Sequence, residues 1–310
     1  MLLAAGAFAV AGVGLLPLAS EFGTILVTNL LLGLGTAGIF PILDARALES
    51  SGAERAGWGP LRAWGSAGWV VSSLLTGLAV ERLGLGIVFV VAAAGFALTA
   101  LLGIGLAPVA RAMAERPLRA GLRLFRTRHL ALFLVGMLFA SASMSAGLDF
   151  LTPRYDELGA PAGLIGLSWA LAAAVEVPVM LAFPALARRF GGARLLVAGA
   201  LIIALRTGIS GVANDPLVLV LASGLGGIGY ALYTVGGVTF VANRVPPELA
   251  ATGQGIFQGA ALGLSGVLAA AVGGVVAGVL GIAGMFAAAG VIGLAAALVV
   301  AVAVLRPGRQ

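Results

Sequence analysis

The chain has 310 residues, of which 61% are hydrophobic and 10% are charged, and its mean hydropathy is +1.12. A soluble domain carries about a quarter charged residues, so this composition excludes a protein that folds in water and predicts one whose solvent is lipid. The net charge of +6 does not indicate nucleic-acid binding, because the arginines lie in short segments between apolar runs, and the lack of cysteine excludes thiol chemistry.

Apolar runs of about 18 to 25 residues, the length of a helix that crosses about 30 Å of hydrocarbon, occur ten times along the chain. Backbone polar groups in lipid must be paired within each segment, so each run predicts a transmembrane helix. The predicted spans are 1–19, 22–44, 60–80, 85–107, 130–151, 161–187, 194–212, 216–241, 252–279 and 282–305. The predicted fold class is therefore all-α, a polytopic bundle of transmembrane helices.

The segments between the spans predict how the chain lies in the membrane. Fifteen of the 18 arginines follow the second, fourth, sixth or eighth span or lie at the C-terminus, whereas Arg82 and Arg154 lie on the opposite side. The positive-inside rule predicts that the arginine-rich segments and the C-terminus face the cytoplasm of a cell (inner) membrane. The segment 109–129 mixes arginines with apolar residues, so we expect a cytoplasmic amphipathic linker between an N-terminal bundle, 1–108, and a C-terminal six-helix bundle, 130–310.

Two segments match the G-x-G-x-x-G pattern of dinucleotide-binding proteins, GLGTAG at 33–38 and GLGGIG at 224–229. Each lies within an apolar run and neither follows a strand, so we predict no cofactor. A single histidine and scattered carboxylates indicate neither a metal site nor the catalytic cluster of a membrane enzyme. The glycines favour close packing between helices instead.

Two charged residues fall near the middle of predicted spans, where a charge costs a few kcal/mol or more. Desolvation disfavours the ionised form of Glu176, so this residue could bind and release a proton near neutral pH. A Glu that pairs with another helix for packing only is the alternative. Arg206 keeps its charge and needs an anion or several carbonyls as its partner. We hypothesise a Glu176–Arg206 charge pair that breaks when a proton or solute binds; a static pair is the alternative.

Several segments carry a resemblance to a known family. The loop ARRFGGARLL at 187–196 is similar to the signature between the second and third helices of each half of the major facilitator superfamily. The segments 41–69, 155–180 and 245–255 resemble the branch that contains lactose permease and the phenylpropionate-type and nucleoside-type proton symporters. This resemblance implies a secondary active transporter with twelve helices in two halves.

The loops at 43–60 and 243–255 correspond at an offset of about 195 residues, which places the counterpart of Arg194 at the N-terminus. We therefore expect about ten of the family's twelve helices, arranged as four plus six, with the first two missing. A chain of this form would be a fragment or a gene model begun at an internal Met. We expect that, as given, it does not transport.

The resemblance also suggests roles for individual residues. Asp44 and Arg62, 18 residues apart at facing ends of two spans, match the acidic residue and arginine that grip the sugar in lactose permease, and Trp69 matches its stacking tryptophan. It further implies substrate binding or proton coupling by Glu176, and proton coupling by Arg206. A salt bridge between two helices at the cytoplasmic interface is the alternative for Asp44 and Arg62.

Three further residues are candidates for lining the solute cavity. Gln254 and Gln258 lie four residues apart on one helix face, where they could bond to solute or across helices. Asp149 lies at the outer end of its span, and a purely interfacial position is the alternative. The span 216–241 has no His or Glu where lactose permease carries further coupling residues, so lactose itself is not predicted.

The resulting expectation is a monomeric proton symporter, not an enzyme, that moves a small polar or weakly acidic solute across the lipid bilayer by alternating access. An exporter of drugs or metabolites in the same superfamily, or a non-transporting scaffold or fragment, is the alternative.

Overall fold

The protein is helical wherever its structure is described. The computed structural model describes residues 2–50, 58–84, 86–105, 127–246 and 249–305, and no strand occurs within these ranges. The predicted all-α fold class is confirmed. The predicted linker at 109–129 lies outside the described ranges except for its last three residues.

The chain forms two compact units. The first contains Met1–Ser50 and Gly68–Arg116, and the second contains Ser51–Ala67 and Pro117–Gln310. The beginning of α3 (Trp58–Leu83) therefore groups with the second unit.

In the first unit, α1 (Leu2–Leu15) packs against α2 (Phe22–Ser50) and α4 (Ile87–Leu102). Short 3-10 turns follow α1 at Leu16–Leu18 and α4 at Gly103–Gly105. The helices approach closely because small residues face each other: a Cβ on Gly35 of α2 would lie 2.5 Å from the backbone nitrogen of Ala9 in α1. Small residues thus allow the close packing that the glycine content predicted.

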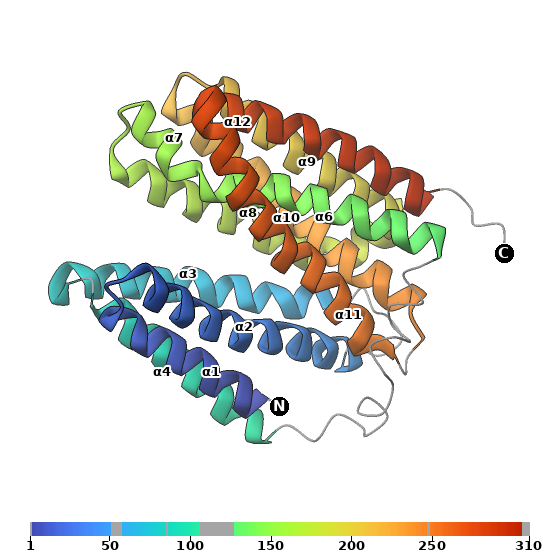
Figure 1. Ribbon diagram of the computed structural model, residues 1–310. Helices are drawn as coiled ribbons and strands as arrows, with labels where there is room; N and C mark the ends of the chain where they lie inside the picture. Colours follow the sequence, from blue (N-terminus) through green and yellow to red (C-terminus); the bar gives the residue numbers. More distant parts are fainter. Residues whose placement is uncertain (1, 51–57, 85, 106–126, 247–248, 306–310) are drawn as a thin grey trace. The chain divides into compact units, whose positions relative to one another are not determined.

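The second unit contains the rest of the helices. They are α6 (Arg128–Asp149), α7 (Leu151–Glu157), α8 (Ala162–Phe190), α9 (Gly192–Val212), α10 (Pro216–Arg244), α11 (Ala250–Gln258), the π-helical turn Gly259–Leu264 and α12 (Ser265–Leu305). Within this unit α12 packs on α6 and α9, and α10 packs on α8 and α9 (Figure 1).

The last two predicted spans meet at Gly281. The chain turns back there, so the two parts of α12 form separate helices (Figure 1). The turn needs glycine, because Gly281 has a φ of 73°, in the left-handed region that side chains with a Cβ rarely adopt.

Within the described residues, six helical stretches are long and apolar enough to cross a membrane. They are Phe22–Ile39, Arg128–Asp149, Gly163–Phe190, Gly192–Val212, Pro216–Arg244 and Thr252–Leu305. Every one of the ten predicted spans contains a helix. The structure has six such stretches and not ten for three reasons. The last two predicted spans count as one stretch, α1 and α4 are shorter, and α3 is not among the six.

Candidate functional site

The carboxylate of Glu176 lies in the membrane-spanning part of α8 and contacts another helix. Glu176 is half-buried near the middle of the Gly163–Phe190 stretch. The hydroxyl of Ser66 in α3 donates a hydrogen bond to Glu176 Oε1, and Ser66 is 5% exposed. Both residues belong to the second unit. A hydroxyl is both a donor and an acceptor, so it can accompany either protonation state of the carboxyl group.

Arg206 lies on α9 and binds a backbone carbonyl. Its side chain is 5% exposed, and Nη1 donates to the carbonyl oxygen of Gly147, near the C-terminal end of α6, over 2.7 Å. A Cβ on Gly147 would lie 2.5 Å from Nη1, and one on Gly226 of α10 would lie 3.5 Å from Nε. Two glycines thus make room for the guanidinium. The hydrogen bonds of Glu176 and Arg206 go to different partners, so the hypothesised pair is not the contact present in this structure.

A second buried arginine, Arg154 in α7, binds the end of α9. It donates to the carbonyl oxygens of Ser210 over 3.2 Å, Gly211 over 3.5 Å and Ala213 over 2.7 Å, and its Nη1 lies 2.7 Å from Glu157 Oε2. The last carbonyls of a helix lack intrahelical partners and carry a partial negative charge, which a guanidinium neutralises. Arg154 therefore caps α9.

The neighbouring Tyr155 also contributes to this region. Its phenol is fully buried and shares a hydrogen bond with the hydroxyl of Ser168 in α8. Burial raises the pKa of the Tyr155 phenol, which stays protonated at neutral pH. Arg154 of α7 thus binds the C-terminal end of α9, Arg206 of α9 binds the C-terminal end of α6, and Tyr155 connects α7 to α8.

The two predicted glutamines lie on α11, but only one is fully buried. Gln254 is 1% exposed, and its Nε2 donates to the carbonyl oxygen of Val238 in α10 over 2.9 Å. Its Oε1 is buried and has no hydrogen-bond partner within the described part of the chain. Gln258 is half-buried and immediately precedes the π-helical turn.

The remaining candidates are two exposed residues and two whose side chains the structure does not describe. Asp149 is the last residue of α6 and is exposed, and Trp69 on α3 is 62% exposed. Asp44 and Arg62 belong to α2 and α3, but their side chains lie outside the described part of the structure. The roles predicted for all these residues stay predictions.

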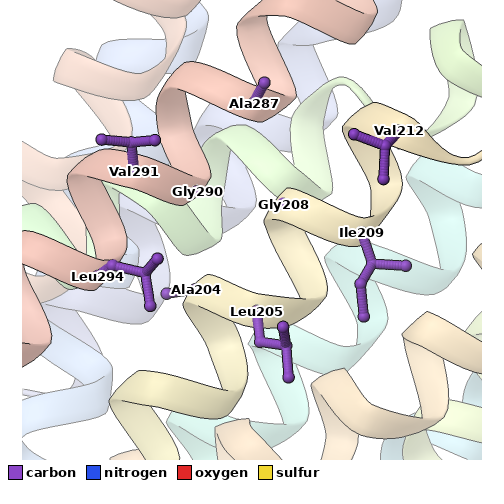
Figure 2. A pocket seen from close by; sticks show the side chains of 9 residues that line it. All are labelled: Ala204, Leu205, Gly208, Ile209, Val212, Ala287, Gly290, Val291 and Leu294. Carbon is purple, nitrogen blue, oxygen red and sulfur yellow. The ribbon is translucent and has the colours of Figure 1, made fainter.

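An apolar groove runs between α9 and the last part of α12, with a volume of about 330 Å³. Figure 2 shows Leu205, Ile209 and Val212 on one wall and Val291 and Leu294 on the other. Gly208 and Gly290 lie where the two helices cross. All nine lining residues are apolar, and none is a predicted site residue, so the groove suits hydrocarbon and not a polar solute.

A family comparison identifies the group of proteins to which the sequence belongs. The profile of the MFS_1 like family matches residues 1–288, which is most of the chain. The chain belongs to this family, within the major facilitator superfamily. It is therefore a multi-pass membrane protein, as the apolar runs predicted.

This MFS_1-like chain is similar to a permease in sequence and to two transporters in structure. It is 26% identical to the maltose permease of Geobacillus stearothermophilus over 259 residues, which is 83% of this chain and 66% of the permease. The crystal structure of the nucleoside transporter NupG is 17% identical, with a TM-score of 0.71, over 98% of this chain and 82% of that one. The crystal structure of the fucose:proton symporter FucP of E. coli is 16% identical, with a TM-score of 0.70, over 97% of this chain and 83% of that one.

Sequence reasoning about this MFS_1-like chain missed Ser66 and the role of Arg154. Ser66 lies four residues after Arg62 and three before Trp69, so helical spacing places it on the face already singled out. Arg154 was interpreted only as a loop charge. The carbonyl oxygens that it binds lie 56 to 59 residues further along the chain, and no local pattern connects them to it.

Proposed function

We propose that this protein is a secondary active transporter that moves a small polar or weakly acidic solute by alternating access, together with protons. The observation that carries the proposal is Glu176, a carboxylate placed within a membrane-spanning stretch and held by a hydroxyl of another helix. A carboxylate in lipid is costly, and a protein that only packs helices has no need of one. Proton binding neutralises it, which gives the proton gradient a way to drive a conformational change.

The solute class rests on the relatives and on the candidate residues. The named relatives are a maltose permease, a nucleoside transporter and a fucose:proton symporter, and all three names refer to solutes rich in hydroxyl groups. Amide, carboxylate and guanidinium groups bind hydroxyls, and an aromatic ring stacks on a sugar face. We assign this binding role to Asp44, Arg62, Trp69, Asp149, Gln254 and Gln258.

The coupling role is assigned to Glu176 and Arg206. In this structure Arg206 binds the Gly147 carbonyl and Glu176 accepts from Ser66. We propose that the two charges come together in another state of the transport cycle, when α6 releases the guanidinium. The ends of the helices with Arg188, Arg189, Arg194 and Arg244 face the cytoplasm in this proposal.

The test is uptake into vesicles that contain the purified protein, with an imposed inward proton gradient. Maltose, L-fucose and uridine serve as labelled probes. We expect accumulation of at least one probe, lost on collapse of the gradient. That result would also show that the expectation drawn from the loop offset, that the chain as given does not transport, is wrong. Glu176→Gln should abolish accumulation above the equilibrium level and preserve exchange of probe across the membrane.

The matched control is Asp156→Asn, which removes an exposed carboxylate of α7 outside the membrane-spanning stretches. It should leave accumulation unchanged. Gradient-driven accumulation by Glu176→Gln at the wild-type level would remove Glu176 from the coupling mechanism.

A further inference from the structure

We infer that Ser66 is a positioning residue for Glu176: its hydroxyl holds the ionised carboxylate and thereby sets the pH range in which this group takes up a proton. This inference rests on the proposed function, in which Glu176 carries the proton. It concerns a residue on a different helix, which neither the family resemblance nor the charge pattern of the sequence identifies.

The contact of Ser66 differs from those of other hydroxyls in the bundle. The hydroxyls of Ser72, Ser223 and Ser265 donate to carbonyl oxygens of their own helices, three or four residues earlier. That is the usual arrangement of serine in membrane helices. The hydroxyl of Ser66 reaches across to a carboxylate on α8, 110 residues later in the chain.

The α3 side of the contact is buried. Ser66 is 5% exposed, and its neighbour Ala63 on the same helix is 3% exposed. Hydrogen bonds to charged groups are stronger where water is scarce, because solvent does not compete for the carboxylate. A substitution at Ser66 should therefore directly change the proton affinity of Glu176.

Other charged and titratable groups also surround Glu176. Ala172 of α8 contacts Gly227 of α10, which places Tyr230 of α10 near the level of Glu176. Arg206 of α9 reaches α10 beside that contact, at Gly226.

Three more charged or titratable groups lie on α7, α3 and α8. Tyr155 of α7 binds Ser168, eight residues before Glu176 on α8. On α3, Arg62 precedes Ser66 by one helical turn, and its side chain lies outside the described part. At the far end of α8, Arg188 lies twelve residues, or about 18 Å, from Glu176. A substitution at Ser66 leaves the chemical identity of each of these groups unchanged.

The direction of the effect follows from the chemistry of the bond. An O–H that donates to a carboxylate stabilises the ionised form more than the protonated form. Without the hydroxyl, Glu176 retains its proton to a higher pH. A charge-assisted hydrogen bond of ordinary strength corresponds to a shift of about one pH unit.

The experiment is a pH titration of the full chain in lipid vesicles, monitored by infrared difference spectroscopy of the protonated carboxyl stretch. The component that disappears in Glu176→Gln is assigned to Glu176, and no solute is needed. Ser66→Ala should raise the midpoint of that component by about one pH unit. Ser66→Thr keeps the hydroxyl and should restore the wild-type midpoint.

Two further variants keep the test decisive. Ser66→Cys has the same size and a weaker donor, so it should shift the midpoint in the same direction by less, even if Ser66→Ala does not fold. Ser72→Ala, on the same helix, is the matched control and should leave the midpoint unchanged.

The outcomes separate this inference from the proposed function. A Glu176 component whose midpoint is the same in wild type, Ser66→Ala and Ser66→Cys would overturn the role of Ser66 and leave Glu176 as the proton carrier. Lack of any titrating component that depends on Glu176 would overturn both. Loss of gradient-driven uptake in Glu176→Gln, together with the expected Ser66 shifts, supports both.

Discussion

The second unit holds charged side chains in two different ways. Arg154 and Arg206 are buried and bind backbone carbonyls at the C-terminal ends of α9 and α6. Glu176 is half-buried and accepts a hydrogen bond from a side chain, the Ser66 hydroxyl. A backbone carbonyl cannot turn away without distorting its helix, whereas a hydroxyl rotates freely. The first arrangement holds a charge in place, permanently at Arg154 and at Arg206 until α6 releases the guanidinium. The second suits a group that changes its protonation state.

If this distinction holds, substitutions at Arg154 should act mainly on stability, and those at Glu176 mainly on transport. The free energy of unfolding in mixed detergent micelles measures the first effect. Vesicle uptake measures the second.

The largest loss of stability is expected for Arg154→Met. The substitution removes the hydrogen bonds to Ser210, Gly211 and Ala213 and leaves the end of α9 uncapped in an apolar environment. We expect the free energy of unfolding to fall by about 3 kcal/mol or more. Arg154→Lys should restore only part of the lost free energy of unfolding, because an ammonium group cannot reproduce the planar set of donors of a guanidinium group. A change below about 1 kcal/mol for Arg154→Met would show that the cap is dispensable.

Gly147→Ala should have the next largest effect. The new Cβ would lie 2.5 Å from Arg206 Nη1, so either the guanidinium or α6 must move. Overpacking of this kind costs about 1 to 3 kcal/mol. Gly266→Ala is the control, since a Cβ there meets nothing within 4 Å, and its greater helix propensity should leave the protein as stable or slightly more stable. Equal unfolding free energies for the two variants would contradict the close fit around Arg206.

Tyr233→Phe tests a neutral polar contact between helices of the same unit. The Tyr233 hydroxyl bonds with Ser141 over 2.6 Å and donates to the Met137 carbonyl over 2.8 Å, and it is fully buried on α10. Loss of the hydroxyl should reduce the free energy of unfolding by about 1 kcal/mol. Tyr230→Phe, on the same helix but half-buried, should cost less. The reverse order would mean that burial does not govern the strength of these contacts.

The sequence predicts where the helices lie and which charges they contain, but not the hydrogen-bond partners of those charges. Apolar runs alone locate the helices, and the turn at Gly281 falls in the gap between the spans 252–279 and 282–305. Hydropathy also identifies Glu176 and Arg206 as charges inside spans. Their partners depend on which faces of distant helices meet: Ser66 and Glu176 are 110 residues apart, and Arg206 and Gly147 are 59 apart. Local periodicity carries no information on such pairs.

The smallest effect on stability, and the largest on transport, is expected for Glu176→Gln. The amide has nearly the shape of the carboxyl group and still accepts from Ser66, and it removes the cost of an ionised group in lipid. We therefore expect a change of less than about 1 kcal/mol in the free energy of unfolding. Gradient-driven accumulation should nevertheless be lost, because an amide cannot release a proton. A destabilisation as large as that of Arg154→Met would make Glu176 a fixed charge like Arg154, and the contrast between the two regions would fail.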